Sequence, residues 1–135
     1  MNKILVEVSV GELLDKISIL EIKQEKIKDP EKLKYINDEH SILKDQLDNN
    51  VKSDEKLNTL FQSLKDINTK LWVIEDDKRL CEKNSDFTEN FIKLSRDVHF
   101  LNDDRAKIKL EINTHTGSKI KEITNLSTYS LAFIF

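Results

Sequence analysis

The stretch SDEKLNTLFQSLKDINTKLWVIEDDKRLCEK, residues 53–83, decides the fold that we expect. Positions three and four residues apart in turn form one seam, and most of them are apolar: Leu57, Leu60, Leu64, Ile67, Leu71, Ile74, Lys78 and Cys81. Such heptad spacing is typical of a long helix that packs against another helix along one face. The stretch therefore predicts a helix over residues 54–83, whose heptad seam runs for about 25 residues, close to 40 Å. Ser53 and the acidic residues after it are expected to open the helix.

A second long helix is predicted over residues 87–114, after a polar break at 84–86. Its seam repeats the same spacing and consists of Phe87, Phe91, Leu94, Val98, Leu101, Arg105, Ile108 and Ile112. Asp86 and Glu89 indicate a capping arrangement at its start. Gly117 is the residue type that commonly ends a helix.

Two shorter helices are predicted before these, over residues 10–28 and 31–48. Ser9 and Glu12 form an S-x-x-E capping box, in which each side chain bonds an amide at the helix start. The pair Asp29-Pro30 combines a cap with a residue whose fixed φ suits the first helical position. Short connections of this kind make consecutive helices antiparallel.

The chain outside the helices is predicted to form two short strands. Residues 3–8 are rich in β-branched side chains, and residues 119–123 offer them a pairing partner. The apolar tail Leu126–Phe135 is too short to span a bilayer, so we expect it to dock on the core or on a partner. Residues 1–118 are thus predicted as a single helical domain, and residues 119–135 as a C-terminal strand and apolar tail.

The composition supports a helical chain. Only two Gly and one Pro occur among 135 residues, too few for the turns of a sandwich or barrel or for a glycine-rich phosphate loop. We therefore predict a mostly α fold, an antiparallel four-helix bundle made of a short and a long helical hairpin. The helices of the second hairpin are longer than those of the first, so the first hairpin cannot cover the tip of the second, around Leu71 to Val98. A homodimer that buries this seam is the expected consequence.

Charge and targeting signals exclude several classes of protein. With 22 basic and 25 acidic residues, the chain has no basic footprint for nucleic acid. Its first ten residues lack the apolar core of a signal peptide, and no apolar run approaches the 18 or so residues of a membrane span. A reducing cytoplasm is therefore the expected setting. No cofactor is indicated, and no complete catalytic motif identifies catalytic residues.

Polar residues at inward positions mark a candidate ligand site. Arg105 lies in a helix seam, where a guanidinium needs an acceptor, and Glu21 is its expected partner. The ligand-binding candidates are Glu21, His40, Asn102, Arg105 and Lys109. They suit a small anion such as a nucleotide or sugar phosphate, held by the two cations, with Glu21 or His40 handling a proton. The structural alternative is a buried salt bridge and a core histidine that fix helix register.

A weaker constellation suits a divalent metal. Its carboxylates and imidazole come from both long helices, at Glu75, Asp76, Asp77, His99 and Asp103. Solvated charge is the usual meaning of such an acidic run. Trp72 beside the seam is interpreted as a core or dimer contact, and Cys81 as a small buried apolar group.

Several stretches resemble a family of small bacterial proteins classed as a domain of unknown function. The motifs are EVSxGELLDKIxILEIK at residues 7–23, LWxIEDD at 71–77 and NDxRAxxK at 102–109, joined by shorter matches up to Gly117-Ser118. The resemblance implies a cytoplasmic helical protein. Family members sometimes occur beside, or joined to, glycosyltransferase-like proteins of surface-polysaccharide synthesis. It supplies no catalytic residues, and after Ser118 the chain is expected to depart from the family pattern.

The leading hypothesis is a non-catalytic helical interaction or scaffold module, homodimeric, that serves polysaccharide or nucleotide-sugar enzymes. A small-anion binder or enzyme that uses Glu21, His40 and Arg105 is the alternative. An acid-rich metal site is a further alternative.

Overall fold

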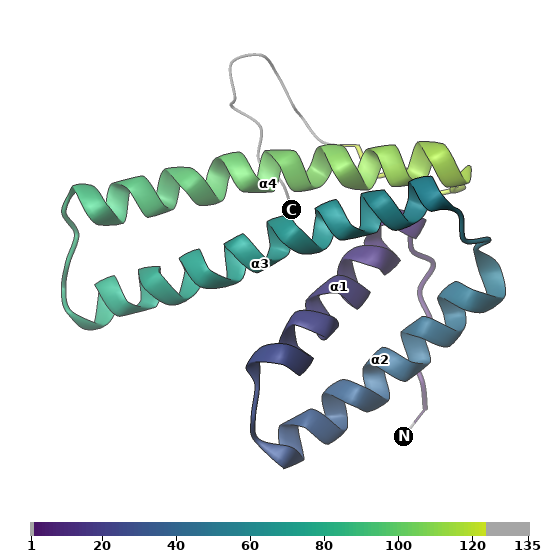
Figure 1. Ribbon diagram of the computed structural model, residues 1–135, viewed down its shortest axis with the longest axis horizontal. Coiled ribbons are helices and arrows are strands. Elements are labelled where there is room, and N and C mark those ends of the chain that lie inside the picture. The colour runs from purple at the N-terminus through teal and green to yellow at the C-terminus, as the bar shows by residue number, and fades with distance from the viewer. Residues whose placement is uncertain (1, 124–135) are drawn as a thin grey trace.

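The structure is a computed structural model that describes residues 2–123, and these residues contain four α-helices (Figure 1). The helices are α1 (Val10–Lys26), α2 (Pro30–Asn50), α3 (Glu55–Lys83) and α4 (Glu89–Thr116). The predicted mostly α fold with four helices is confirmed. No helix within these residues combines the length and the apolar character that a membrane crossing needs.

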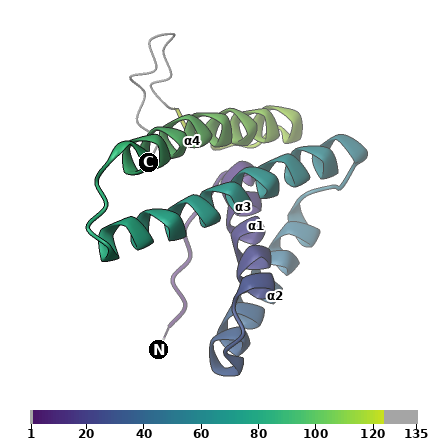
Figure 2. The same ribbon diagram turned by 60° about the vertical axis from the view of Figure 1, so that its left-hand side comes forward.

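The helices form two hairpins of unequal length. The long α3–α4 hairpin carries the short α1–α2 hairpin across one of its ends, and the views in Figure 1 and Figure 2 agree on this arrangement. α1 packs against α2, α3 and α4, whereas α2 packs along α1. The other end of the long hairpin, toward the turn between α3 and α4, extends beyond the short hairpin.

The main core lies where the hairpins meet. Its buried members come from α1, α3 and α4: Leu14, Leu57, Leu60, Leu64 and Ile112. Leu47, in the last turn of α2, also packs against this cluster. The seam residues predicted from the heptad spacing thus supply much of the interior.

Local signals define most helix ends. Ser9 caps α1, because its Oγ accepts a hydrogen bond from the Glu12 amide at 3.0 Å. In place of the predicted capping-box bond to Ser9, the Glu12 carboxylate accepts from Lys109 Nζ at 2.6 Å. Asp29 caps α2 ahead of Pro30, as predicted. Gly117 ends α4 with a φ of +67°, the left-handed conformation that glycine adopts without steric cost.

Two helix starts differ from the prediction. Asp54, not Ser53, caps α3, because its carboxylate accepts from the Leu57 amide at 2.7 Å while the Ser53 hydroxyl donates to Asn58. Asp86 does not cap α4. Its carboxylate instead accepts from the amide and hydroxyl of Thr88, so a turn precedes the helix.

The predicted strands are wrong for the residues that the structure describes. Neither residues 3–8 nor residues 119–123 form a strand. Side-chain bonds instead join the start of α1, after residues 3–8, to residues 118 and 122: Ser9 Oγ donates to Glu122 Oε1 at 2.6 Å, and the Val10 amide donates to Ser118 Oγ at 3.2 Å. The β-branched residues of 3–8 favour an extended chain, but a strand is stable only when it pairs with a neighbouring strand. The predicted apolar tail lies outside the described residues.

Candidate functional site

The centre of the inward polar layer is Asp15 on α1, which is buried. Its Oδ1 accepts from Arg105 Nε at 2.9 Å and from Asn68 Nδ2 at 2.8 Å, and its Oδ2 accepts from Arg105 Nη2. Asn68 Nδ2 also donates to Ser18 Oγ at 2.8 Å. The carboxylate therefore has a partner on each oxygen and joins α1 to α3 and α4. The buried Asp15 carboxylate and the half-buried Arg105 guanidinium thus satisfy each other in a bidentate pair.

Burial and charge act on Arg105 in opposite directions. Burial alone would lower the pKa of its guanidinium, because desolvation disfavours the charged form. The hydrogen bond and the charge of Asp15, together with the charges of Glu12 and Glu122, outweigh burial, and the pKa of Arg105 is raised above its ordinary value.

A second polar group lies at the start of α1. Lys109 Nζ donates to Glu12 Oε2 at 2.6 Å and to Glu122 Oε2 at 3.4 Å. The Gly11 amide donates to Asn113 Oδ1 at 2.7 Å, and a Cβ on Gly11 would meet the Lys109 carbonyl oxygen at 2.6 Å. Only glycine lets the α1 backbone approach α4 this closely. The close approach places Asp15, one turn farther along α1, within reach of Arg105.

Glu21 belongs to a third group and is not the partner of Arg105. It lies 3.2 Å from His40 Nε2 on α2 and 3.4 Å from Lys65 Nζ on α3. Lys65 also donates to Glu25 at 2.9 Å; that bond is the main cause that raises the pKa of Lys65 and lowers the pKa of Glu25. Glu21 comes six residues after Asp15, about 9 Å along the helix axis. At that level its partners come from α2 and α3 rather than from α4.

The predicted ligand residues thus divide between two places. Glu21 and His40 meet beside Lys65, while Arg105 and Lys109 pair with acids near the start of α1. Asn102 is half-buried on α4, one turn before Arg105. The acceptor Asp15 and the polar residues around it were not among the predicted site residues. Their signal was a stripe of buried α1 positions at spacings of three and four that contains small and polar residues: Gly11, Leu14, Asp15, Ser18 and Ile22.

The weak metal candidates do not assemble. In the described part of the chain, no three His, Cys, Asp or Glu side chains are placed to hold a metal ion. Asp76 lies 3.5 Å from Arg79 within α3, and His99 Nε2 lies 3.8 Å from Asp103 Oδ2 within α4. These are contacts within single helices. Cys81 is buried, as predicted, and Trp72 is half-buried.

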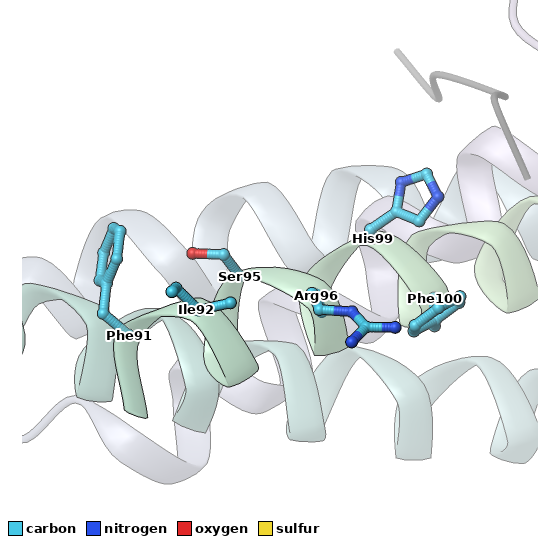
Figure 3. Close-up of a pocket in the computed structure, with 6 residues that line it drawn as sticks. All are labelled: Phe91, Ile92, Ser95, Arg96, His99 and Phe100. Carbon is cyan, nitrogen blue, oxygen red and sulfur yellow. The ribbon is translucent and has the colours of Figure 1, made fainter. Parts of the chain in front are cut away.

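Two hollows accompany these groups. One, of about 310 Å³, follows α4 and is shown in Figure 3; we call it the α4 groove, lined by Phe91, Ile92, Ser95, Arg96, His99 and Phe100. The other, of about 240 Å³, lies between α1, α2 and α3, with apolar walls such as Leu14, Leu47 and Phe61. Its charged edge holds Glu21 and the ion-paired residues Lys44 and Asp48. With two acidic side chains and one basic side chain, the edge of this hollow is net negative and does not favour the binding of an anion.

A family model described as "Family of unknown function (DUF6165)" matches residues 4–132. No curated protein and no solved structure matches the chain. The family match runs past Ser118, so the expected departure from the family pattern at that residue is wrong. Most of the predicted apolar tail falls inside the matched range.

Proposed function

The chain belongs to the family of unknown function DUF6165, and on that premise we propose that it is a non-catalytic helical interaction module that acts as a homodimer. The observation that carries the proposal is the part of the α3–α4 hairpin that extends beyond α1 and α2. We call this part, residues 71–98, the distal hairpin. Figure 1 and Figure 2 show that the short hairpin does not cover it.

The distal hairpin exposes large apolar side chains: Val73, Leu80, Phe87 and Ile92. Phe87 and Phe91 stack edge to face, with centroids 5.6 Å apart, and Lys78 Nζ lies 5.9 Å from the Phe91 ring centroid. Single exposed apolar residues are ordinary, but a group of them on one uncovered hairpin is typical of an interaction surface.

A second copy is the partner that fits the charge pattern of the distal hairpin. Along α3, the acidic turn 75–77 is followed directly by Lys78 and Arg79. In a two-fold dimer the same patch meets itself, so an antiparallel α3 from the second copy brings the acidic turn opposite the basic pair. Apolar contact and charge complementarity then favour the same arrangement.

The closed polar layer supports a non-catalytic function. Arg105 and Lys109, the cations proposed to hold an anion, already contact Asp15 and Glu12. An incoming anion would have to displace a buried carboxylate from a bidentate pair, which leaves that charge uncompensated. Ligand binding at Arg105 therefore requires that Asp15 move away from it, whereas dimerisation through the distal hairpin leaves this pair intact.

The small-anion and metal alternatives have a direct test. We propose a thermal-shift screen of the full chain with nucleotides, nucleotide sugars, Mg²⁺ and Mn²⁺. A ligand at about 100 times its dissociation constant stabilises the folded state by about 2.7 kcal/mol, which a melting curve resolves. No shift is expected. A saturable shift that Arg105→Met abolishes would favour the anion site instead.

The setting that we propose is the cytoplasm, beside glycosyltransferase-like enzymes of surface-polysaccharide synthesis. This part of the proposal rests on the genomic and fusion neighbours of the family that the sequence resembles. Within such a setting, a dimeric helical module would hold partner enzymes together and carry out no chemistry itself.

The dimer is tested by charge substitution on the distal hairpin. In the double variant Leu80→Lys/Phe87→Lys, two side chains that are 56% and 55% exposed become cations. The matched control is Ile42→Lys on α2, where the native side chain is 57% exposed. By light scattering at micromolar concentration, the wild type and the control should weigh twice 15.8 kDa, and the double variant 15.8 kDa. A monomeric wild type, or equal dissociation of the control, would contradict the proposal.

A further inference from the structure

We propose that the apolar tail of this chain, Leu126–Phe135, docks in cis on the α4 groove. The tail lies outside the described residues, so the inference rests on the groove, on the path of the chain that leads to the tail, and on the tail sequence. The groove shares Phe91 and Ile92 with the distal hairpin. A docked tail would therefore leave Val73, Leu80 and Phe87 as the exposed apolar side chains of the proposed dimer surface.

The α4 groove offers an apolar binding surface with one cation. Ile92 and Phe100 are large apolar side chains that remain exposed. The Arg96 guanidinium lies over the Phe100 ring, 5.8 Å from its centroid, and Figure 3 shows the lining side chains along one length of the helix. The groove has a volume of about 310 Å³ and aromatic and aliphatic walls. It can therefore accommodate a few apolar side chains.

The chain after α4 already turns back toward the groove. Gly117 ends the helix, and Glu122 then contacts both Lys109 on α4 and Ser9. Lys109 lies about two turns before the end of α4 at Thr116. Residue 122 is therefore held at the level of Lys109, and the groove begins nine residues farther back along α4, at Phe100, about 14 Å away.

The tail is long enough to cover the groove. From residue 122, Leu131 is nine residues away and can reach up to about 30 Å in an extended chain. The far end of the groove at Ile92 lies about 26 Å along the helix from Lys109. The five consecutive apolar residues 131–135 can thus lie over the whole length between Phe100 and Ile92.

A buried carboxylate oxygen lies between Lys109 and the groove. Asp103 Oδ1 is buried and has no hydrogen-bond partner among the described residues. A buried acceptor without a donor is costly. The segment 124–130, TNLSTYS, supplies hydroxyl and amide donors and no charge, and it is the part of the tail that would pass Asp103.

Tethering favours docking in cis. A segment joined to its site by a short length of the same chain sees that site at an effective concentration of about millimolar, above the micromolar concentration of a second copy. The uncharged apolar tail is also poorly solvated when exposed. The family match, which extends to residue 132, includes most of the tail.

A disulfide trap in the full chain tests the docking. Ser95→Cys/Ala132→Cys places one thiol in the groove and one in the tail, and Ser41→Cys/Ala132→Cys is the control, with the thiol on the exposed surface of α2. The expected result under mild oxidation is an intramolecular cross-link, at least tenfold more abundant in the first variant. Equal cross-linking in both variants overturns the proposal. So does a cross-link that forms only between chains when the single variants Ser95→Cys and Ala132→Cys are mixed.

Hydrogen exchange provides a second measurement that does not depend on thiols. Phe133→Asp/Phe135→Asp should accelerate amide exchange in peptides over residues 91–100 several-fold and leave α2 unchanged. Ser127→Asp/Ser130→Asp adds the same charge but keeps both rings, and serves as the control. Unchanged exchange over residues 91–100 in the first variant overturns the proposal. Light scattering on the same samples reports the oligomeric state separately.

Discussion

Asp15 is the residue on which the junction of the two hairpins depends. A carboxylate buried at the α1 interface with α3 and α4 is stable only while Arg105 and Asn68 donate to it. The net Coulomb attraction of the pair adds little to the stability of the fold. Loss of one partner is nevertheless costly, because the buried charge of Asp15 would remain without a counterion.

Removal of the guanidinium should be costly. Arg105→Met leaves Asp15 without its bidentate donor and is expected to lower the free energy of unfolding by about 3 kcal/mol. Urea denaturation followed by circular dichroism measures the change. Asp15→Asn/Arg105→Met removes both charges, keeps an acceptor for Asn68, and should restore most of the loss. Arg79→Met, at a side chain 79% exposed, should change stability by less than about 0.5 kcal/mol.

Stability of Arg105→Met close to that of the wild type would mean that Asp15 does not need its partner. The ligand interpretation of Arg105 would then gain support, since a cation that folding does not require is available for binding.

The sequence placed Arg105 correctly in a helix seam but did not identify its acceptor. Periodicity shows which face of a helix is inward, whereas the pairing of two inward polar groups depends on how far one helix is displaced along another. Here the displacement is set by the contact of Gly11 with the α4 backbone, which no periodic pattern reveals.

At the scale of elements, one carboxylate–imidazole contact joins the start of α3 to the end of α4. Asp54 accepts from the Leu57 amide as the α3 cap, and both of its oxygens lie within 3.0 Å of His115 Nε2. The Leu57 amide first, and then His115, hold the pKa of Asp54 below its ordinary value of 3.8. The cap and the contact between helices therefore share one carboxylate.

The pH dependence of stability should show this carboxylate. A group with a lowered pKa in the folded state stabilises it at pH above the unfolded value and loses that contribution as pH falls through the folded value. The urea midpoint of Asp54→Asn should thus lie below that of the wild type near pH 7, and the two should converge below about pH 4. Asp45→Asn on α2 controls for the loss of one negative charge. A gap that stays constant down to about pH 2 would contradict the role of Asp54.

The elements show where sequence information is sufficient. Seams with heptad spacing, the caps Ser9 and Asp29 and the stop at Gly117 were readable, because each acts within a few residues of itself. The strand at residues 3–8 was wrong for the opposite reason. A strand is completed only by a neighbour, and residues 118 and 122 instead bond the start of α1 through their side chains.

At the scale of the molecule, the two hairpins meet in one core and differ in how much of each is buried. In α2 only Ile36 is buried, whereas α3 has six buried residues. The helix α1 lies between them and contacts all three others. Local opening should therefore begin at α2 and reach α3 last.

Hydrogen exchange of the native protein should resolve this order. Amides in the middle of α2 are expected to exchange about tenfold or more faster than those of α3 near Leu64. Mass spectrometry of peptides from the two helices measures both rates in one sample. Equal rates would show that the hairpins open as one cooperative unit.

The contact between Ser9 and Glu122 has a mechanical consequence. The chain enters the helical domain at Ser9 and leaves it near Glu122, and these two residues are hydrogen-bonded at 2.6 Å, with Val10 and Ser118 beside them. A pulling force applied to the preceding arm and to the following tail would load these few side-chain bonds first. The four helices between them would bear no tension until the bonds part. The domain should therefore resist extension first through these side-chain bonds, and only afterwards through the packing of its helices.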